Sequence, residues 1–237
     1  MKLFFCLLLF SAGLLANDIV VTVHGYARTH KSMHKMGRAL QKNGYNLYHF
    51  DYLSRSQSIE ESTEDFVTFL REISKQHPDS QINFVTHSLG GILLRAAVND
   101  PNCPKIAKQG SAILLGPPNR GSRLAKRIAL ILKLMGRGAG NDLAKNRDFS
   151  YLGDFPESMK VTIIAGTFGC NPLIPFPNDG KVALSETLLD TPHKFFEVSA
   201  CHSMMMSNSK VITTILEELN AQNYSRNTAI LGNPSSG

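Results

Sequence analysis

The sequence predicts an α/β fold: a trimmed, mostly parallel sheet of about six strands with helices on both faces. The first observation behind this prediction is that short runs of β-branched and apolar residues alternate with segments of helical periodicity. The second is a strand that turns sharply into a helix at Ser88, with small residues around the corner. The third is size, because 237 residues, 43% of them hydrophobic, suffice for one domain with a core.

The first half of the chain supplies most of the alternation. Strands are expected where β-branched or aromatic residues are concentrated, at 19–23, 46–51, 82–85 and 111–115. Helices are expected between them, at 32–43, 58–76 and 91–98. Ser58 and Glu61 have the spacing of a capping box, which fixes the start of the second helix. Strands joined by helices in this way run parallel.

The pattern changes after the fourth strand. Residues 116–122 form a turn-rich loop, and the insertion 123–158 contains a basic, apolar helix at 124–135 and a Gly-rich connector at 136–140. The sheet is expected to resume at 161–166 and to end at 194–198, with a long loop between these two strands. A closing helix then carries Val211, Ile215 and Leu219 on one face.

The two ends of the chain differ from this domain. Residues 1–16 have the layout of a secretory signal peptide, because Lys2 precedes an apolar run that is too short to span a bilayer comfortably. An uncleaved membrane anchor is the alternative interpretation. Residues 17–220 form the predicted domain, and the polar segment 221–237 is expected to be a flexible tail. The protein is therefore predicted to be exported, either secreted or periplasmic.

Charge and cysteine content limit the partners. The net charge of +6, or +5 without Lys2, favours anionic surfaces such as phospholipid and does not indicate nucleic acid. No Cys/His spacing suggests a metal site. Of the three cysteines beyond the signal segment, Cys170 and Cys201 both follow strands, so they form either a disulfide or two independent thiols, and Cys103 lies at the other edge.

Ser88 is the candidate nucleophile. It stands in Thr86-His-Ser-Leu-Gly90, between the predicted strand and a buried helix. Such a corner holds the serine in a strained conformation and projects its hydroxyl from the sheet edge. Position 86 is Thr where the common signature has Gly. A serine that merely caps the following helix is the alternative interpretation.

An acylating serine needs a base and an acid that orients the base. His202 is the candidate base, because it follows the last strand and precedes the closing helix. Asp179 is the candidate acid, in an Asn-Asp-Gly turn after the strand at 161–166, and it completes the order Ser, Asp, His. A plain turn aspartate is the alternative, with Asp154 or Asp190 as the acid.

Backbone amides are predicted to hold the oxyanion. His24-Gly-Tyr26 follows the first strand, and Gly25 permits a close backbone approach. The N–H groups of Tyr26 and Leu89 are the two candidate donors. Because only backbone groups are needed there, the side chain of His24 is interpreted as a structural one.

Together these residues resemble the α/β-hydrolase superfamily, and within it the small bacterial-type triacylglycerol lipases and esterases. The resemblance rests on Val23-His-Gly-Tyr26, Thr86-His-Ser-Leu-Gly-Gly91, Pro118-Asn-Arg-Gly-Ser122, Asn178-Asp-Gly-Lys-Val182 and His202-Ser203, in family order over most of the chain. It implies an ester or lipid substrate, an acyl-enzyme on Ser88, and no cofactor or metal. The chain lacks the strands that precede the oxyanion strand in larger members.

Substrate size is expected to depend on the insertion and on an apolar pocket. The helix at 124–135 is interpreted either as a lid that contacts an anionic membrane or lipid surface, or as an ordinary helix that covers the sheet. Met204, Met205, Ile174 and Phe176 are the candidate pocket residues.

Other functions remain open at this level. An acyltransferase or a thioesterase would use the same three side chains and differ only in the acceptor or the bond cleaved. A non-catalytic binding protein is disfavoured, because none of the three side chains is missing.

Overall fold

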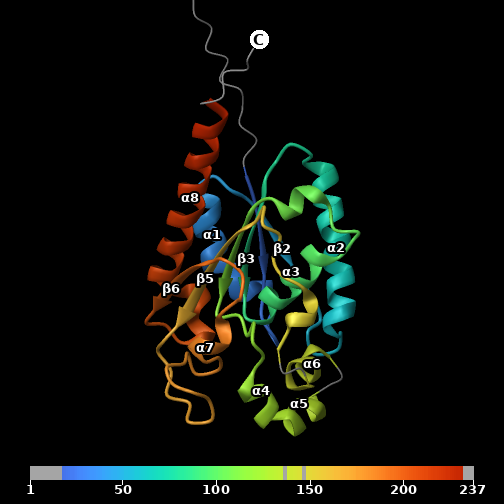
Figure 1. Ribbon diagram of the computed structural model, residues 1–237, viewed down its shortest axis with the longest axis vertical. Coiled ribbons are helices and arrows are strands. Elements are labelled where there is room, and N and C mark those ends of the chain that lie inside the picture. Colours follow the sequence, from blue (N-terminus) through green and yellow to red (C-terminus); the bar gives the residue numbers. More distant parts are fainter. Residues whose placement is uncertain (1–17, 136–137, 146–147, 232–237) are drawn as a thin grey trace, which may run out of the picture.

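A computed structural model of the chain describes residues 18–135, 138–145 and 148–231 (Figure 1). Its centre is a six-stranded sheet in the order β2-β1-β3-β4-β5-β6, in which every neighbouring pair of strands is parallel. The predicted α/β fold and its strand number are therefore confirmed. The predicted signal peptide at 1–16 lies outside the described residues.

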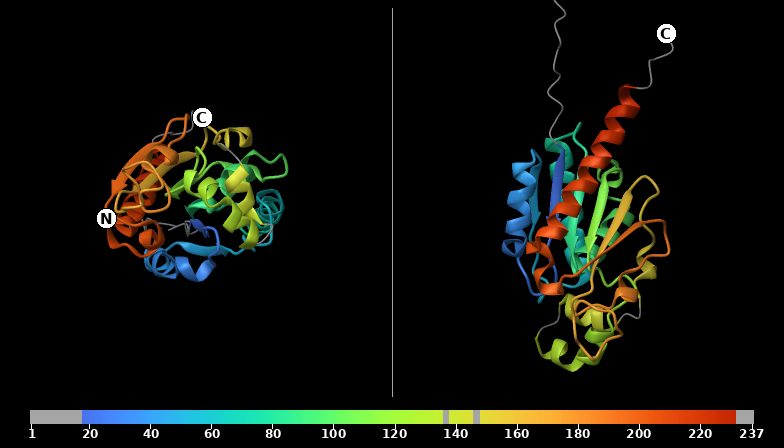
Figure 2. Two further views of the ribbon diagram at one scale, coloured as in Figure 1. Left: turned by 90° about the horizontal axis from the view of Figure 1, so that it is seen from below. Right: turned by 90° about the vertical axis from the view of Figure 1, so that its left-hand side faces the viewer.

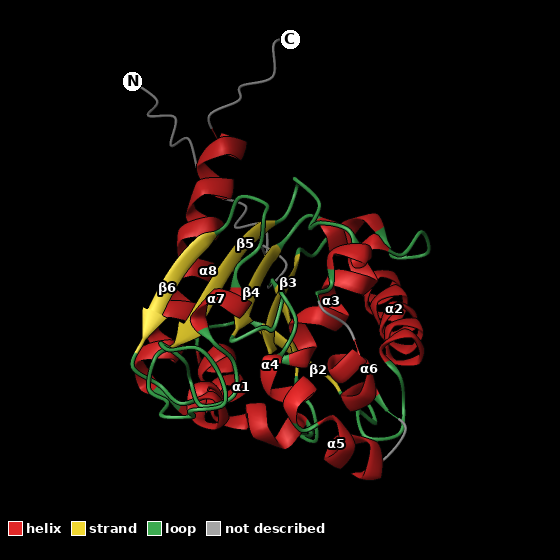
Figure 3. Ribbon diagram, turned by 60° about the horizontal axis from the view of Figure 1, so that its bottom comes forward, coloured by secondary structure: helices red, strands yellow, loops and turns green. Residues whose placement is uncertain are grey.

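The strands lie close to their predicted positions. They are β1 (Ile19–Val23), β2 (Asn46–Phe50), β3 (Ile82–His87), β4 (Ser111–Leu115), β5 (Lys160–Gly166) and β6 (Lys194–Val198). Pairing of Val23 with Thr86, and of Leu115 with both His87 and Ile164, aligns the carboxyl ends of the central strands. All arrows accordingly point to one edge of the sheet (Figure 3). The loops after the strands meet at this edge, where open α/β sheets bind their ligands.

The α-helices are α1 (His34–Lys42), α2 (Ile59–Gln76), α3 (Leu89–Asn99), α4 (Arg123–Arg127), α5 (Ala129–Met135), α6 (Ala139–Lys145), α7 (Leu184–Thr187) and α8 (Ser209–Leu231). Short 3-10 helices are η1 (His30–Met33), η2 (Lys105–Lys108), η3 (Ser150–Leu152) and η4 (His202–Ser207). The capping box predicted at Ser58 and Glu61 is present at the start of α2.

Two apolar cores lie on the two faces of the sheet. Helices α1 and α8 cover one face and α2 and α3 the other (Figure 1). Alternate residues of a strand enter different cores, as Val20 and Val21 of β1 show. No helix in the described ranges is both long and apolar enough to cross a membrane.

The first part of the insertion, residues 123–135 and 138–145, lies beyond the carboxyl edge of the sheet and does not cover a face (Figure 1). Helices α4, α5 and α6 form a small group below the strands, which we call the cap (Figure 2). The interpretation of 124–135 as an ordinary helix that covers the sheet is therefore wrong, because these residues lie beyond the edge of the sheet. The cap is attached to the loop before α2, because the N–H of Gly138 donates to Arg55 O at 3.1 Å and that of Ala139 to Gln57 O at 2.7 Å.

Two predicted helix boundaries need correction. The helix at 124–135 is broken at Ile128, which leaves the helical conformation at φ −104° and ψ 20°. This bend lets Leu124 and Leu132 line the same cavity, which is described below. The closing helix does not end near residue 220, because α8 continues to Leu231 through part of the predicted flexible tail. Gln222 is buried, so this extension begins against the domain.

Candidate active site

Ser88 occupies the tight corner between β3 and α3. Its φ of 53° and ψ of −120° lie in a region that residues with a side chain rarely adopt. Its N–H donates to Leu115 O at 2.8 Å, which ties the corner to the neighbouring strand β4. Strain held in place by the surrounding structure is typical of the nucleophile elbow.

Small residues around Ser88 allow its close packing. A Cβ added to Gly90 would lie 2.6 Å from Val23 O and 2.8 Å from His24 O, so only glycine lets α3 begin directly against the end of β1. A Cβ on Gly25 would lie 2.8 Å from His87 Nδ1 and 3.1 Å from Ser88 Cβ. The loop 24–26 therefore rests on the corner that carries Ser88, as its predicted role requires.

The structure brings His202 and Asp179 together. His202 Nδ1 donates to Asp179 Oδ2 at 2.7 Å, and the two side chains are only 6% and 1% exposed. The His202 N–H also donates to Asp179 O at 2.8 Å, so the turn and the histidine are joined twice. Because Nδ1 is engaged, Nε2 is the ring nitrogen that remains to accept a proton. His202 lines the same cavity as Ser88.

The carboxylate of Asp179 is held by its own turn. Oδ1 accepts from the N–H of Lys181 at 3.0 Å and from that of Val182 at 2.8 Å. The two other candidate acids lie elsewhere: Asp154 pairs with Arg95 at 3.5 Å and Asp190 with Arg120 at 2.5 Å. Of these three carboxylates, only that of Asp179 contacts His202.

Two backbone amides near Ser88 have no acceptor among the residues that the structure describes. The N–H groups of Tyr26 and Leu89 donate to no described residue. The side chain of Tyr26 lines the cavity, and Leu89 is the first residue of α3. Leu89 begins α3, and amides at a helix start carry partial positive charge. Together with the Tyr26 amide in the loop 24–26, the Leu89 amide is suited to hold an oxyanion.

The side chain of His24 supports this loop from beneath. It is fully buried, contacts Gly25 O through Nδ1 at 2.9 Å, and stacks on Tyr52 with ring centroids 4.4 Å apart. Tyr52 Oη donates to His24 O at 2.9 Å. Burial lowers the pKa of His24 below its ordinary value. These contacts agree with the structural interpretation of His24, whereas the sequence did not indicate the participation of Tyr52.

His87 is a second buried histidine beside the candidate base. Its Nε2 donates to His202 O at 3.0 Å, and the centroids of the two rings are 4.7 Å apart. Burial, and then the neighbouring His202, hold the pKa of His87 well below its ordinary value. His87 therefore stays neutral and positions the backbone of His202.

This burial predicts a pH-dependent stability. The unfolded chain binds a proton at His87 below about pH 6.5, whereas the folded protein does not. The contribution of His87 to stability should therefore be complete above that pH and be lost as the pH falls, by up to about 1.4 kcal/mol per pH unit. Urea unfolding between about pH 5 and pH 8 measures how the free energy of unfolding changes with pH. His87→Gln should remove from this slope the contribution of one proton. An unchanged slope in His87→Gln would contradict this account.

The cavity at Ser88 has a volume of about 110 Å³. Its apolar wall comes largely from the cap, through Leu124, Ala125, Leu132 and Leu143, and from Val182. Sequence periodicity identified an apolar stripe in the insertion but could not show which of its residues would face Ser88. The cavity also contains two cations that the sequence analysis did not assign, Arg28 and Lys181.

The four predicted pocket residues do not line this cavity. Met205 is fully buried in the core beneath α8, and Ile174 is 6% exposed within its own loop. Met204 is 58% and Phe176 is 74% exposed. The 3-10 turn of η4 explains the methionines, because it directs Met205 and Met206 toward the sheet and Met204 outward. This prediction is therefore wrong for the cavity around Ser88.

The cysteines of the described chain are free. Cys103 is buried, which raises its pKa to about 11, Cys170 is exposed and Cys201 is half-buried. The open question of a Cys170–Cys201 disulfide is thus decided in favour of independent thiols. Among the residues that the structure describes, no group of three His, Cys, Asp or Glu side chains could hold a metal ion.

Comparisons with known proteins identify the family of this chain and other proteins that share its fold. The family described as "Serine aminopeptidase, S33" matches residues 16–161, more than half of the 237 residues. No curated protein matches the sequence significantly. Among solved structures, phospholipase PlaB from Legionella pneumophila is similar, with a TM-score of 0.56 and 20% identity over 73% of this chain and 46% of that chain. The present chain thus spans less than half of that phospholipase.

Two further structures are similar over most of both chains. Est1E from Butyrivibrio proteoclasticus has a TM-score of 0.60 and 15% identity, over 88% of this chain and 90% of that one. A soluble variant of monoglyceride lipase from Saccharomyces cerevisiae has a TM-score of 0.59 and 15% identity, over 89% and 87% respectively. At such identities the likeness shows a shared fold.

Proposed function

Since the chain belongs to the serine aminopeptidase S33 family of the α/β-hydrolase superfamily, we propose that it is a serine hydrolase that cleaves carboxylic esters. Ser88 is the nucleophile, His202 the general base and Asp179 the acid that orients it. The observation that carries this proposal is the buried Asp179–His202 pair at 2.7 Å, whose histidine lines the same cavity as Ser88, a serine with φ of 53°.

The reaction follows from these positions. His202 Nε2 takes the proton of Ser88 Oγ, and Oγ attacks the ester carbonyl carbon. The carbonyl oxygen becomes an oxyanion that accepts hydrogen bonds from the N–H groups of Tyr26 and Leu89. The C–O bond to the alcohol breaks, and the alcohol leaves with the proton from Nε2. Water, deprotonated by Nε2, then attacks the acyl-enzyme and releases the acid and Ser88.

The family description also names an aminopeptidase, and the charges at the cavity favour an ester instead. An aminopeptidase must accommodate the ammonium group of its substrate. The charged side chains that line the cavity around Ser88, within the described residues, are Arg28 and Lys181, with no carboxylate among them. Like charge repels the ammonium group, so an uncharged or anionic ester is the better fit.

An acyltransferase or thioesterase would proceed through the same acyl-enzyme. A transferase would pass the acyl group to an alcohol in preference to water, so product analysis with an added alcohol separates it from a hydrolase. A thioesterase would prefer thioesters over oxygen esters of equal acyl length.

Fluorophosphonate labelling tests the proposal directly. This reagent forms a covalent bond with an activated serine, and mass spectrometry locates it. We expect the label on Ser88 and not on Ser122, a second serine that lines the same cavity. Turnover of p-nitrophenyl esters of increasing acyl length then separates an esterase from a lipase. A folded protein that neither labels nor hydrolyses esters, with or without detergent, would contradict the proposal.

We also propose that the cap contacts anionic lipid surfaces. Leu130 is 72% and Ile131 is 55% exposed, and the exposed cations Arg127 and Lys133 stand beside them in sequence. Apolar side chains among cations are suited to a membrane interface. The protein should therefore sediment with vesicles of anionic phospholipid. A smaller fraction of the doubly substituted Leu130→Ser/Ile131→Ser protein should sediment with them. Equal sedimentation with purely zwitterionic vesicles would contradict the charge contribution.

A further inference from the structure

Two cations whose side chains have no partner among the described residues line the cavity at Ser88. Arg28 follows the loop that carries Tyr26, and Lys181 follows Asp179 in the acid turn. Neither side chain forms a hydrogen bond or an ion pair with a described residue. Both side chains border one cavity of about 110 Å³. Burial and then Arg28 lower the pKa of Lys181, whereas Asp179 raises it. Positive charge is thus concentrated beside the candidate nucleophile, because none of the described residues that line this cavity is an aspartate or a glutamate.

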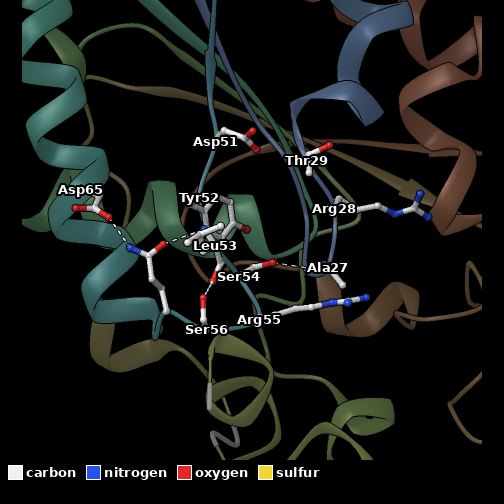
Figure 4. A pocket seen from close by; sticks show the side chains of 11 residues that line it. Ala27, Arg28, Thr29, Asp51, Tyr52, Leu53, Ser54, Arg55, Ser56 and Asp65 are labelled. Carbon is white, nitrogen blue, oxygen red and sulfur yellow. Dashed lines mark hydrogen bonds between the residues drawn. The ribbon is translucent and has the colours of Figure 1, made fainter. Parts of the chain in front are cut away.

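A second, larger cavity adjoins this one at Arg28. It has a volume of about 650 Å³ and is lined by residues 27–29, 51–57 and 65, so that Arg28 borders both cavities. Figure 4 shows Arg28 and Arg55 extending from the wall of this cavity toward the same side, away from Asp65. Arg55 likewise has no side-chain partner among the described residues.

The two carboxylates of the larger cavity contact other side chains than these arginines. Asp51 contacts His30 Nδ1 at 2.6 Å and His24 Nε2 at 2.7 Å. Asp65 accepts a hydrogen bond from Gln57 Nε2 at 2.6 Å. Neither Asp51 nor Asp65 forms an ion pair with Arg28 or Arg55, so the two guanidinium groups remain available to a ligand.

We propose that the substrate of this enzyme is an ester that carries an anionic group, a phosphate or a carboxylate, which binds between Arg28 and Lys181 while the ester carbonyl lies at Ser88. The inference rests on the proposed hydrolase function and names its substrate class. An arginine forms paired hydrogen bonds with either anion, and a lysine adds a point charge. An anion at this place would also relieve the repulsion between the two cations. The larger cavity, with Arg55, extends the room for the charged part of the substrate.

Two matched pairs of soluble esters test this inference and distinguish the two anions. Butyryl glycerol and butyryl glycerol 3-phosphate differ by a phosphate on the alcohol side. Ethyl pentanoate and monoethyl glutarate differ by a carboxylate on the acyl side. Acid release gives kcat/KM for each, and we expect the anionic member of at least one pair to be preferred. The pair that shows the preference identifies the anion and the side of the ester on which it binds.

Variants then assign the preference to the two side chains. Arg28→Gln and Lys181→Gln should each lower the ratio of anionic to neutral kcat/KM by about three- to tenfold, mainly through KM, because each removes one charge-assisted contact at a partly exposed site. Arg28→Lys should retain more of the ratio than Arg28→Gln. The matched control is Arg71→Gln, an exposed arginine of α2, which should leave the ratio unchanged.

The outcomes separate this inference from the proposed function. Two outcomes would overturn the inference alone, provided that neutral esters are hydrolysed and that Ser88 is required. In the first, the anionic esters are not preferred. In the second, the preference survives in the double variant Arg28→Gln/Lys181→Gln. Absence of hydrolysis of all four esters overturns both. If a glutamine variant does not fold, inhibition of the wild-type protein decides. Glycerol 3-phosphate or glutarate should compete with the neutral ester, and glycerol should not. Lack of competition by both anions overturns the inference.

Discussion

Replacing Ser88 with alanine is expected to lower kcat for carboxylic esters by roughly 10⁴- to 10⁶-fold. The change removes the oxygen that attacks the carbonyl but keeps Cβ, so the corner at Ser88 retains its backbone geometry. Circular dichroism and the urea midpoint should remain close to those of the wild-type protein. The measurement is kcat on a short p-nitrophenyl ester, together with the loss of fluorophosphonate labelling. Retention of more than a few per cent of the activity in a clean preparation would remove Ser88 from the role of nucleophile.

A second substitution at the same position separates chemistry from strain. Ser88→Gly should be as inactive as Ser88→Ala, yet it should stabilise the protein by about 1 kcal/mol relative to Ser88→Ala, because glycine adopts a positive φ without steric cost. Urea unfolding of the two variants gives this difference. A larger stability for the alanine variant would show that the φ of 53° carries no strain.

The sheet, and the placement of Ser88, Asp179 and His202 at one edge of it, could be predicted from the sequence because each depends on local signals. Alternating apolar strands and helices gave the parallel sheet, and parallel strands necessarily bring their following loops to one edge. Ser88 and His202 each follow a strand closely, so their position along the chain nearly determines their position in space. Asp179 stands in a strong turn signal, and the pairing with His202 needed only that this turn reach the same edge.

The pocket could not be predicted because it depends on how the cap folds back. An apolar periodicity does not show that the helix at 124–135 breaks at Ile128 or that Leu143 would close the same cavity. Met205 was misplaced for a related reason: a run of methionines has no periodicity that distinguishes the core face from the cavity face. Arg28 lies two positions beyond Tyr26, and Lys181 stands inside the motif at 178–182 without an assigned role. That neither side chain has a partner among the described residues appears only in three dimensions.

Replacing Asp179 with asparagine is the second large expected effect, a loss of roughly 10³- to 10⁴-fold in kcat with the fold retained. The geometry of the turn fixes how the new amide must point. The N–H groups of Lys181 and Val182 both donate to Oδ1, so the oxygen of the introduced amide would be required there. Its NH₂ group would then face His202 Nδ1, where the carboxylate now accepts at 2.7 Å. His202 would have to accept at Nδ1 and carry its proton on Nε2, the atom that must take the proton of Ser88.

The controls come from the same argument. Asp154→Asn and Asp190→Asn remove the two other candidate acids, which pair with Arg95 and Arg120 and not with His202, so both should retain nearly full kcat. The imidazole ¹⁵N shifts of His202 report the tautomer: the proton should be on Nδ1 in the wild-type protein and on Nε2 in Asp179→Asn. A normal kcat in Asp179→Asn, or a collapse in Asp154→Asn or Asp190→Asn, would place the orienting acid elsewhere. A low kcat with an unchanged tautomer would leave Asp179 as the acid but assign its effect to charge, since the amide preserves shape and removes the negative charge beside the imidazolium that forms during attack.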